Sequence, residues 1–291
     1  MKKMLNNNYI RYMNTISFPG LNLNLNINRI AIKIGSIEIY SYAICIVVAI
    51  LVSFLLLKKC KEKYNIDFDF TFYTIIYCLI FGIFGARIYY VLFNLNYYIQ
   101  NPIEILNLRS GGLAIYGGLI AGLIVIYIRC KKEKINMYNF LDYIIPFVAI
   151  GQSIGRWGNF FNIEAYGISC QSILRMGIQT TTGYLEVHPV FFYEACFTFL
   201  IFLFLRYKQK NREFEGEIVL TYLMLYSFVR FFLENLRIDS LMFFSLRISV
   251  VVSIVVFVIS LVIYFKEKLK CRKMSKKAEK DRLKKTAKAV K

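Results

Sequence analysis

Long apolar runs dominate this chain, and they restrict its possible folds more than any other feature. Hydrophobic residues make up 57% of the 291 residues, far more than in an ordinary soluble domain. Most of the seven runs approach the roughly 20 residues that a helix needs to cross a bilayer. They are residues 39–57, 71–93, 112–128, 141–155, 189–205, 218–236 and 248–265. Because lipid cannot satisfy backbone hydrogen bonds, each run must form a helix and not a strand.

The expected fold is therefore an all-α polytopic membrane protein with seven transmembrane helices. The fourth run is short, at about 15 residues where roughly 20 are needed. Two explanations stay open: this helix is tilted, or it is completed by the glycine-containing segment that follows it.

Basic residues are concentrated after alternate runs. The formal net charge is +19, and groups of Lys and Arg follow the first, third and fifth runs. These groups are Lys58, Lys59, Lys61 and Lys63; Arg129, Lys131, Lys132 and Lys134; and Arg206, Lys208, Lys210 and Arg212. The intervening loops contain only Arg109, Arg156, Arg175, Arg237 and Arg247. Since short cytoplasmic loops carry the excess of Lys and Arg, we expect the amino end outside and the carboxyl end cytoplasmic.

This topology divides the chain into an extracytoplasmic segment (1–38), a seven-helix membrane domain (39–265) and a basic cytoplasmic tail (266–291). The first segment lacks the apolar region of a signal peptide, and we expect short helices on the outer surface, with residues 21–27 amphipathic or strand-like. We expect the tail to be helical or disordered and to lie near anionic lipid, not to bind nucleic acid.

Cysteine and histidine usage argues against a metal centre. The 7 Cys are scattered without ligand spacing, and the chain has 1 His. A disulfide framework is not indicated, and we expect neither a metal nor another cofactor.

A segment rich in glycine and polar residues follows the fourth run. Residues 151–167 read GQSIGRWGNFFNIEAYG and contain Arg156, Asn159, Asn162 and Glu164. A guanidinium and a carboxylate at the edge of a bilayer are costly unless they face protein or a polar ligand. An anionic, hydroxylated lipid headgroup would suit these side chains. The alternative is a salt bridge in a loop with turn glycines.

Two further runs carry unusual residues near their outer ends. Arg87 and Tyr90 lie on one helix face in the second run, where Arg87 either has a function or extends to the membrane surface. The third run begins GGLAIYGGLIAG and presents Tyr116 from a helix with glycines on one stripe. These glycines allow either close helix packing or access for a substrate. Asp142 is interpreted as a helix cap.

The sixth run combines opposite charges on one face. Tyr226, Arg230, Glu234 and Arg237 are spaced four, four and three residues apart, so the sequence places them together on a helix. A self-contained ladder of ion pairs is one interpretation. In the fifth run, Glu194 lies deep enough to need a partner.

Four motifs resemble those of the prolipoprotein diacylglyceryl transferases, in the same order. The first is G-R-x-G-N-F-x-N-x-E-x-x-G, filled from Gly155 to Gly167. The others are G-x-R-x-x-Y-V at Arg87, H-P-x-x-x-Y-E at His188, and Y-x-x-x-R-x-x-x-E-x-x-R-x-D from Tyr226 to Asp239. The resemblance covers roughly residues 39–239. Many family members have a histidine where this chain has Tyr116.

The resemblance implies an activity and a location. The expected reaction transfers the sn-1,2-diacylglyceryl group from phosphatidylglycerol to the lipobox cysteine thiol of a prolipoprotein signal peptide, forming a thioether and releasing glycerol phosphate. The enzyme would act in the bacterial cell membrane, with its active site towards the outer face. Membrane lipid, phosphatidylglycerol and prolipoproteins are the implied partners.

The resemblance also implies roles for individual residues. The expected catalytic residues are Arg156, Arg230, Glu164 and Tyr116. Phosphatidylglycerol binding is expected from Arg156, Asn159, Asn162, Gly167, Arg87, Tyr226, Glu234, Arg237 and His188. The group that takes the thiol proton stays open among Tyr116, Glu164, His188 and the combined field of the arginines. The alternative function is a transporter or flippase of an anionic lipid or metabolite, although the chain shows no inverted repeat.

Overall fold

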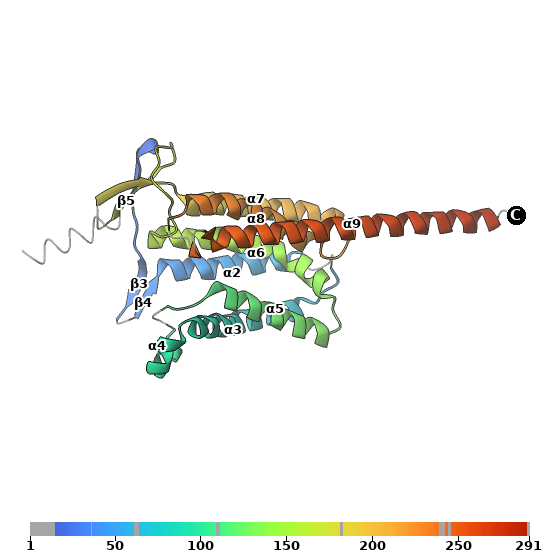
Figure 1. Ribbon diagram of the computed structural model, residues 1–291, viewed down its shortest axis with the longest axis horizontal. Helices are drawn as coiled ribbons and strands as arrows, with labels where there is room; N and C mark the ends of the chain where they lie inside the picture. Colours follow the sequence, from blue (N-terminus) through green and yellow to red (C-terminus); the bar gives the residue numbers. More distant parts are fainter. Residues whose placement is uncertain are drawn as a thin grey trace, which may run out of the picture. The chain divides into compact units, whose positions relative to one another are not determined.

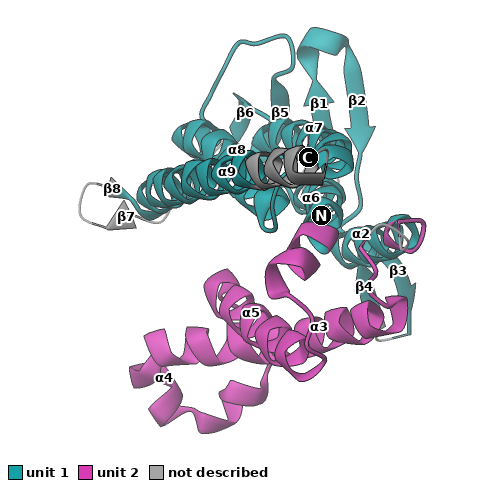
Figure 2. Ribbon diagram, turned by 90° about the vertical axis from the view of Figure 1, so that its right-hand side faces the viewer, with its two compact units in different colours: residues 1–56, 144–291 teal, residues 57–143 magenta. Residues whose placement is uncertain are grey.

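The computed structural model describes residues 15–35, 37–60, 64–108, 111–180, 183–238, 242–243 and 246–289. Within these ranges the chain is mostly helical. It forms two compact units, one made of Met1–Leu56 with Ile144–Lys291 and the other of Leu57–Tyr143 (Figure 2). Four residues noted above lie outside the described ranges: Lys61, Lys63, Arg109 and Asp239.

Each of the seven apolar runs forms a helix. These helices are α2 (Ser41–Lys58), α3 (Phe68–Phe93), α5 (Ile115–Lys132), α6 (Met137–Asn162), α7 (Val190–Lys208), α8 (Glu217–Leu236) and α9 (Ile248–Ala289). Among the described residues, four helical stretches are long and apolar enough to cross a membrane: Ser41–Lys58, Phe68–Phe93, Val190–Asn211 and Ile248–Lys277. The other three helices, α5, α6 and α8, contain glycine, proline or ionisable residues that lower their mean hydropathy.

The fourth helix is longer than its apolar run. Helix α6 begins at Met137 and continues to Asn162, so that its last turns include the first part of the motif from Gly155 to Gly167, which we call the signature. Its 26 residues correspond to about 39 Å at 1.5 Å per residue. The prediction that the following segment completes this helix is therefore confirmed. The interpretation of Asp142 as a cap is wrong, because Asn136 accepts the first backbone N–H groups and Asp142 lies buried inside the helix.

The all-α prediction is wrong in one respect, because the first unit also contains small antiparallel sheets. Strands β1 (Thr15–Phe18), β2 (Leu23–Asn26), β5 (Met176–Thr180) and β6 (Gly183–Val187) form one sheet in the order β2-β1-β5-β6. Strand β2 confirms the strand-like alternative for residues 21–27. Elsewhere in the described part of residues 1–38 we find strands and the 3₁₀ turn η1 (Pro19–Leu21), not short α-helices.

Two hairpins complete the strands. Strand β3 (Ile30–Ile34) pairs with β4 (Ile37–Tyr40), which leads directly into α2, and β7 (Met242–Phe243) pairs with β8 (Leu246–Arg247), which leads into α9.

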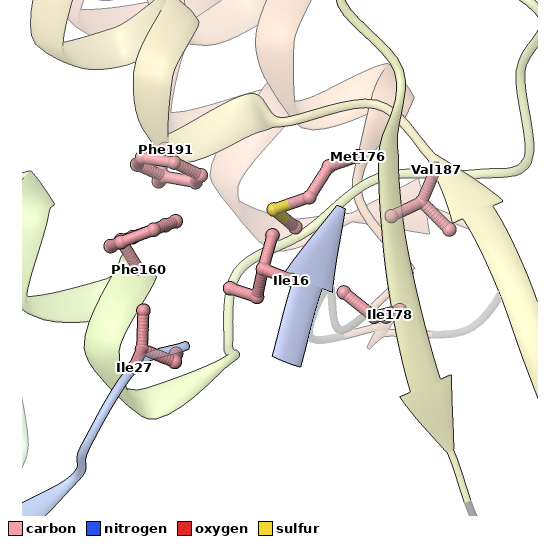
Figure 3. Close-up of a cluster of buried hydrophobic side chains, with 7 residues drawn as sticks. All are labelled: Ile16, Ile27, Phe160, Met176, Ile178, Val187 and Phe191. Carbon is pink, nitrogen blue, oxygen red and sulfur yellow. The ribbon is translucent and has the colours of Figure 1, made fainter. Parts of the chain in front are cut away.

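The four-stranded sheet packs on the end of α6, which carries the signature, and on the start of α7. Its core side chains come from the strands, from Ile27 just after β2, from α6 and from α7, and they meet in one cluster (Figure 3). The members are Ile16, Ile27, Phe160, Met176, Ile178, Val187 and Phe191. Phe160 is part of the signature, so this core fixes the last turn of α6 against the first turn of α7 (Figure 1).

The second unit is built around the close pair α3 and α5. A Cβ atom added at Gly85 would overlap Ala121 and the Gly117 carbonyl oxygen, and one added at Gly117 would overlap the Gly85 carbonyl oxygen. Close packing is thus the role of these glycines. The expectation that α5 includes Gly111 and Gly112 is wrong, because both precede the helix with φ of 87° and 73°.

The carboxyl-terminal tail continues α9 as a helix to Ala289, which confirms the helical alternative. Near the start of the tail, α9 contacts the end of α7 and the start of α8. The Tyr264 hydroxyl donates to Glu217 Oε1 at 3.1 Å, and Lys208 Nζ lies 2.8 Å from the same oxygen. This buried cluster joins α9 to the neighbouring helices at that end.

Candidate active site

Three helices of the first unit bring their charged residues together. Arg156 of α6 and Arg230 of α8 both bind the carboxylate of Glu194 on α7. The distances are 2.5 Å from Arg156 Nη2 to Glu194 Oε1 and 3.1 Å from Arg230 Nη1 to Glu194 Oε2. The two arginines therefore converge, and a single carboxylate lies between them.

The cluster continues along α8 as an alternating ladder. Arg230 Nη2 lies 2.7 Å from Glu234 Oε2, and the Tyr226 hydroxyl donates to Glu194 Oε1 at 3.1 Å. Two guanidinium groups face two carboxylates, so the ladder has no formal net charge. This balance matters because an unpaired charge in a buried position is strongly destabilising.

The arginine side chains of the ladder are more exposed than its glutamate side chains. The carboxylate side chains of Glu194 and Glu234 are only 2% exposed, whereas Arg156 is 25% and Arg230 18% exposed. The arginines are thus the accessible members of the ladder, and the carboxylates hold them from behind. An approaching anion would meet the guanidinium groups first.

The spacing on α8 explains most of this arrangement. Tyr226, Arg230 and Glu234 share one face, as predicted from their four-residue intervals. Arg237 does not continue that face, because α8 ends at Leu236 and Arg237 has extended backbone angles, with φ −78° and ψ 146°. The prediction that all four residues share one helical face is wrong for Arg237.

The polar end of the signature forms a second hydrogen-bonded group. Glu164 Oε1 accepts from Asn159 Nδ2 at 2.9 Å and from Asn162 Nδ2 at 3.2 Å. Asn159 Oδ1 in turn accepts from Arg156 Nη1 at 3.4 Å, which links this group to the ladder. Glu164 is exposed and the two asparagines are half-buried, and such carboxylate and amide groups are suited to binding hydroxyl groups.

The backbone around Glu164 is unusual. Its neighbours Ile163 and Ala165 both have positive φ, 54° and 56°, a conformation that is rare for residues other than glycine. Such conformations persist only where surrounding structure enforces them, and they are frequent at functional sites. With this backbone conformation at Ile163 and Ala165, the side chain of Glu164 lies against Asn159 and Asn162, which donate to it.

Gly167 joins three segments at the edge of the site. Its N–H donates to the His188 carbonyl oxygen at 2.9 Å, and it forms a β-bridge with Arg237. A Cβ atom here would lie within 3 Å of Leu236 and His188 atoms, so only glycine fits. The His188 ring lies nearby with Nδ1 3.3 Å from the Tyr193 hydroxyl. Gly167 and His188 therefore shape the site boundary through backbone contacts.

Arg87 and Tyr116 belong to the second unit. Arg87 is 4% exposed and does not extend to the protein surface; its guanidinium donates to backbone carbonyl oxygens between α3 and α5. Tyr116 is the second residue of α5 and is 37% exposed.

Sequence reasoning missed the central position of Glu194. Its depth in the fifth run correctly indicated that it needs a partner, but it was not assigned to the site. The signal that could have found it is its place in the H-P-x-x-x-Y-E motif, beside Tyr193 and six residues after His188. Its partners, Arg156, Arg230 and Tyr226, are brought to it by the packing of three helices.

Comparison with known proteins connects this site to a family. The family model described as prolipoprotein diacylglyceryl transferase matches residues 29–266. A phosphatidylglycerol–prolipoprotein diacylglyceryl transferase of Finegoldia magna is 44% identical over 204 residues, which cover 70% of this chain and 81% of the relative. The proteins of the same name in Clostridioides difficile and Streptococcus pneumoniae are 47% and 46% identical, and each match covers 60% of this chain. These matches cover 68% and 69% of the two relatives. Arg156, Glu194 and Arg230 all lie within the matched range, and the chain belongs to the prolipoprotein diacylglyceryl transferase family.

Proposed function

We propose that this chain transfers the sn-1,2-diacylglyceryl group of phosphatidylglycerol to the lipobox cysteine of prolipoproteins. The observation that carries the proposal is the convergence of Arg156 and Arg230, from two different family motifs, on the carboxylate of Glu194, from a third. Family membership supports a transferase over the transporter alternative.

The reaction requires displacement at carbon. The cysteine sulfur forms a bond to the glycerol carbon that carries the phosphate ester, and the C–O bond to that phosphate breaks. The leaving glycerol phosphate keeps the bonding electron pair, and the thiol proton passes to an acceptor. Negative charge therefore grows on the phosphate oxygens in the transition state.

Arg156 and Arg230 are placed to stabilise this charge. A guanidinium offers a planar fork of N–H groups that matches phosphate geometry. Donors held in place before the reaction are often the largest catalytic contribution. In the absence of lipid, Glu194 keeps both arginines directed at one point. The phosphate then takes over part of their hydrogen bonding from the carboxylate.

The asparagine–Glu164 group is suited to the headgroup. Phosphatidylglycerol ends in a glycerol with free hydroxyl groups, and Asn159, Asn162 and Glu164 present amide and carboxylate groups close to Arg156. We propose that these three side chains bind the hydroxyls while Arg156 binds the adjacent phosphate. Glu234 holds Arg230, and Tyr226 holds Glu194.

The thiol proton needs little assistance. A free cysteine has a pKa of about 8.5, so its ionisation at pH 7 costs only about 2 kcal/mol. An approaching thiol would meet the exposed guanidinium groups of Arg156 and Arg230 before the buried carboxylates, which favours its ionisation. Tyr116, Glu164 and His188 are the alternative acceptors. Tyrosine is the poorest of these at its ordinary pKa of about 10.

Reconstitution tests the activity directly. Purified protein is mixed with phosphatidylglycerol and a lipobox peptide, and mass spectrometry detects the diacylglyceryl adduct. A peptide with Ser in place of the lipobox Cys serves as the control. We expect adduct only with the cysteine peptide; its absence with folded protein would contradict the proposal.

We further propose a topology for the membrane. Residues 39–265 cross the bacterial cell membrane seven times as the catalytic domain, residues 1–38 lie outside, and residues 266–291 lie in the cytoplasm as a tail that binds no nucleic acid. The active site then faces the outer side. The alternation of Lys and Arg between loops supports this orientation. Four helical stretches that are able to span a membrane support the assignment of the domain.

Cysteine labelling in intact cells tests the orientation. Ser172→Cys and Ser275→Cys are made separately in a background without the native cysteines, because Cys170 lies beside Ser172. A membrane-impermeant reagent should label residue 172 and leave residue 275 unlabelled until the cells are opened. Labelling of residue 275 in intact cells would contradict the proposed topology.

A further inference from the structure

Arg87 of α3 has an unusually complete set of backbone partners. Its guanidinium donates to five carbonyl oxygens. Nε donates to Ile105, Nη1 to Gly111 and Gly112, and Nη2 to Glu104 and Asn107, over distances of 2.5–3.1 Å. An arginine side chain has five N–H groups, so this number of acceptors matches its full capacity.

All of these carbonyls belong to the connection between α3 and α5. This connection contains α4 (Leu95–Gln100) and the 3₁₀ turn η3 (Pro102–Leu106). Among its described residues, 94–108 and 111–113, only Tyr98 is buried, and the Tyr98 ring lies under the Arg87 guanidinium at 5.2 Å. The connection therefore has almost no hydrophobic core of its own, and Arg87 supplies the contacts that order it.

The same contacts fix the start of α5. Gly111 and Gly112 adopt positive φ and direct their carbonyl oxygens to Arg87. Two residues later, the Ala114 N–H donates to the Ala86 carbonyl oxygen at 3.1 Å. Tyr116 follows on the first turn of the helix. Its position is thus set by Arg87 through the short backbone segment that precedes it.

We propose that Arg87 is a positioning residue, which holds the α3–α5 connection and the start of α5 in place for diacylglyceryl transfer, and that it does not bind the lipid phosphate. The inference rests on the proposed function. A phosphate could bind Arg87 only by displacing carbonyl oxygens, which would then lose their hydrogen bonds inside the protein. The arginines of the ladder differ, because they are partly exposed and held by side chains.

Lysine cannot replace Arg87 in this role. Its ammonium group has three N–H donors at a single point, whereas the five carbonyl oxygens are distributed around a planar fork. Lysine keeps the positive charge, however, so it retains much of a simple electrostatic attraction to phosphate. Arg87→Lys therefore separates the two roles.

The experiment combines kinetics with hydrogen exchange on the full-length protein. For Arg87→Lys we expect kcat to fall about 10-fold or more while KM for phosphatidylglycerol changes less than about twofold. Amide exchange of residues 111–114 should accelerate by about 10-fold or more. Arg129→Lys is the matched control, since Arg129 joins the same helix pair by packing over the rings of Phe70 and Tyr77. It should leave both readouts within about twofold.

A second variant approaches the same contacts from the other side. Gly112→Ala leaves Arg87 in place but puts a Cβ atom against Arg87 Nη1 and the Tyr90 ring, at a φ of 73° that favours glycine. Gly112→Ala should reproduce the loss of kcat and the faster amide exchange. If Arg87→Lys does not fold, Gly112→Ala tests the proposal in its place.

The outcomes are distinguishable. An increase in KM of about 10-fold with unchanged exchange would identify Arg87 as a lipid ligand and overturn the inference. Unchanged kcat would overturn it as well, whatever the exchange rates. If the wild-type protein formed no adduct, the proposed function would fail instead, and exchange would still report on the Arg87 contacts.

Discussion

The arginines of the two units are held in opposite ways. Arg156 and Arg230 are bound by the side chains of Glu194 and Glu234, whereas Arg87 is bound by main-chain carbonyl oxygens. A carboxylate can rotate away when a competing anion arrives, but a carbonyl moves only with its backbone. The ladder is therefore suited to binding and releasing a phosphate, and the Arg87 contacts are suited to maintaining a shape.

Burial strengthens this contrast. Arg156 and Arg230 keep 25% and 18% of their side chains exposed, while Arg87 is 4% exposed as a residue. An arginine in a membrane helix is thus not by itself evidence of a ligand site. A ligand can bind only where the N–H groups of the arginine do not already donate to acceptors that are fixed in the protein.

The largest effect is expected from lysine at either arginine of the ladder. Arg156→Lys and Arg230→Lys retain charge but lose the fork, so transfer should fall by about 10²–10³-fold, as for other lost transition-state donors. The initial rate of adduct formation measures this, and thermal unfolding checks that each variant is folded. Near-normal turnover in both variants would favour a structural ion-pair role and remove the contrast with Arg87.

A smaller effect should follow loss of the bridging charge. Glu194→Gln keeps the shape and an acceptor oxygen but leaves the two arginines less neutralised and less firmly aligned. We expect transfer to fall about 10-fold, and the product glycerol phosphate to inhibit at an about 10-fold lower concentration. Inhibition curves measure the second effect.

Glu186→Gln is the matched control for that variant. Glu186 pairs with Arg175 at 2.6 Å on the partly exposed sheet, where a salt bridge contributes little. It should leave both rate and inhibition unchanged. If Glu194→Gln and Glu186→Gln had the same effect on rate and inhibition, the carboxylate of Glu194 between the two arginines would have no role in transfer.

Glu164→Gln distinguishes headgroup binding from proton transfer. A glutamine keeps an oxygen for Asn159 and Asn162, so a binding role predicts an increase of about 10-fold or less in KM for phosphatidylglycerol with nearly unchanged kcat. A general base would instead cost about 10²–10⁴-fold in kcat. Steady-state kinetics at several lipid concentrations separate these results, and we expect the first.

The smallest effect is expected at Tyr116. If the arginine field activates the thiol, Tyr116→Phe should lower the rate less than about threefold, and the rate should still increase with pH as the thiolate fraction grows. The pH–rate profile of the folded variant is the measurement. A loss of about 100-fold or more would identify the phenol as a base and contradict activation by the field.

Much of the fold could be predicted because helix formation is a local property here. Each apolar run became a helix, and the shared face of Tyr226, Arg230 and Glu234 follows from spacing alone. The four-stranded sheet could not be predicted, because it pairs Ile16 with Ile178, far apart in the chain. Asp142 was misjudged for a simpler reason: α6 begins at Met137, ahead of the apolar run.

The candidate site shows the same division. The signature identified Arg156, Asn159, Asn162 and Glu164 as a polar group, and the hydrogen bonds among them agree. The position of Arg237 beyond the end of α8 could not be predicted. The helix ends at Leu236, where Gly167 and Ile168 make backbone contacts with Arg237 and Leu236.

The helices, their apolar character and the family follow from the order of the amino acids, since hydropathy and motif spacing are properties of neighbouring residues. The role proposed for each arginine depends instead on how the helices pack. Whether a guanidinium meets a movable carboxylate, as Arg156 and Arg230 do at Glu194, or is filled by carbonyls, as Arg87 is, depends on groups from other segments. Hydrogen-bond capacity is finite, so the partners that packing supplies leave one arginine available to a ligand and another not.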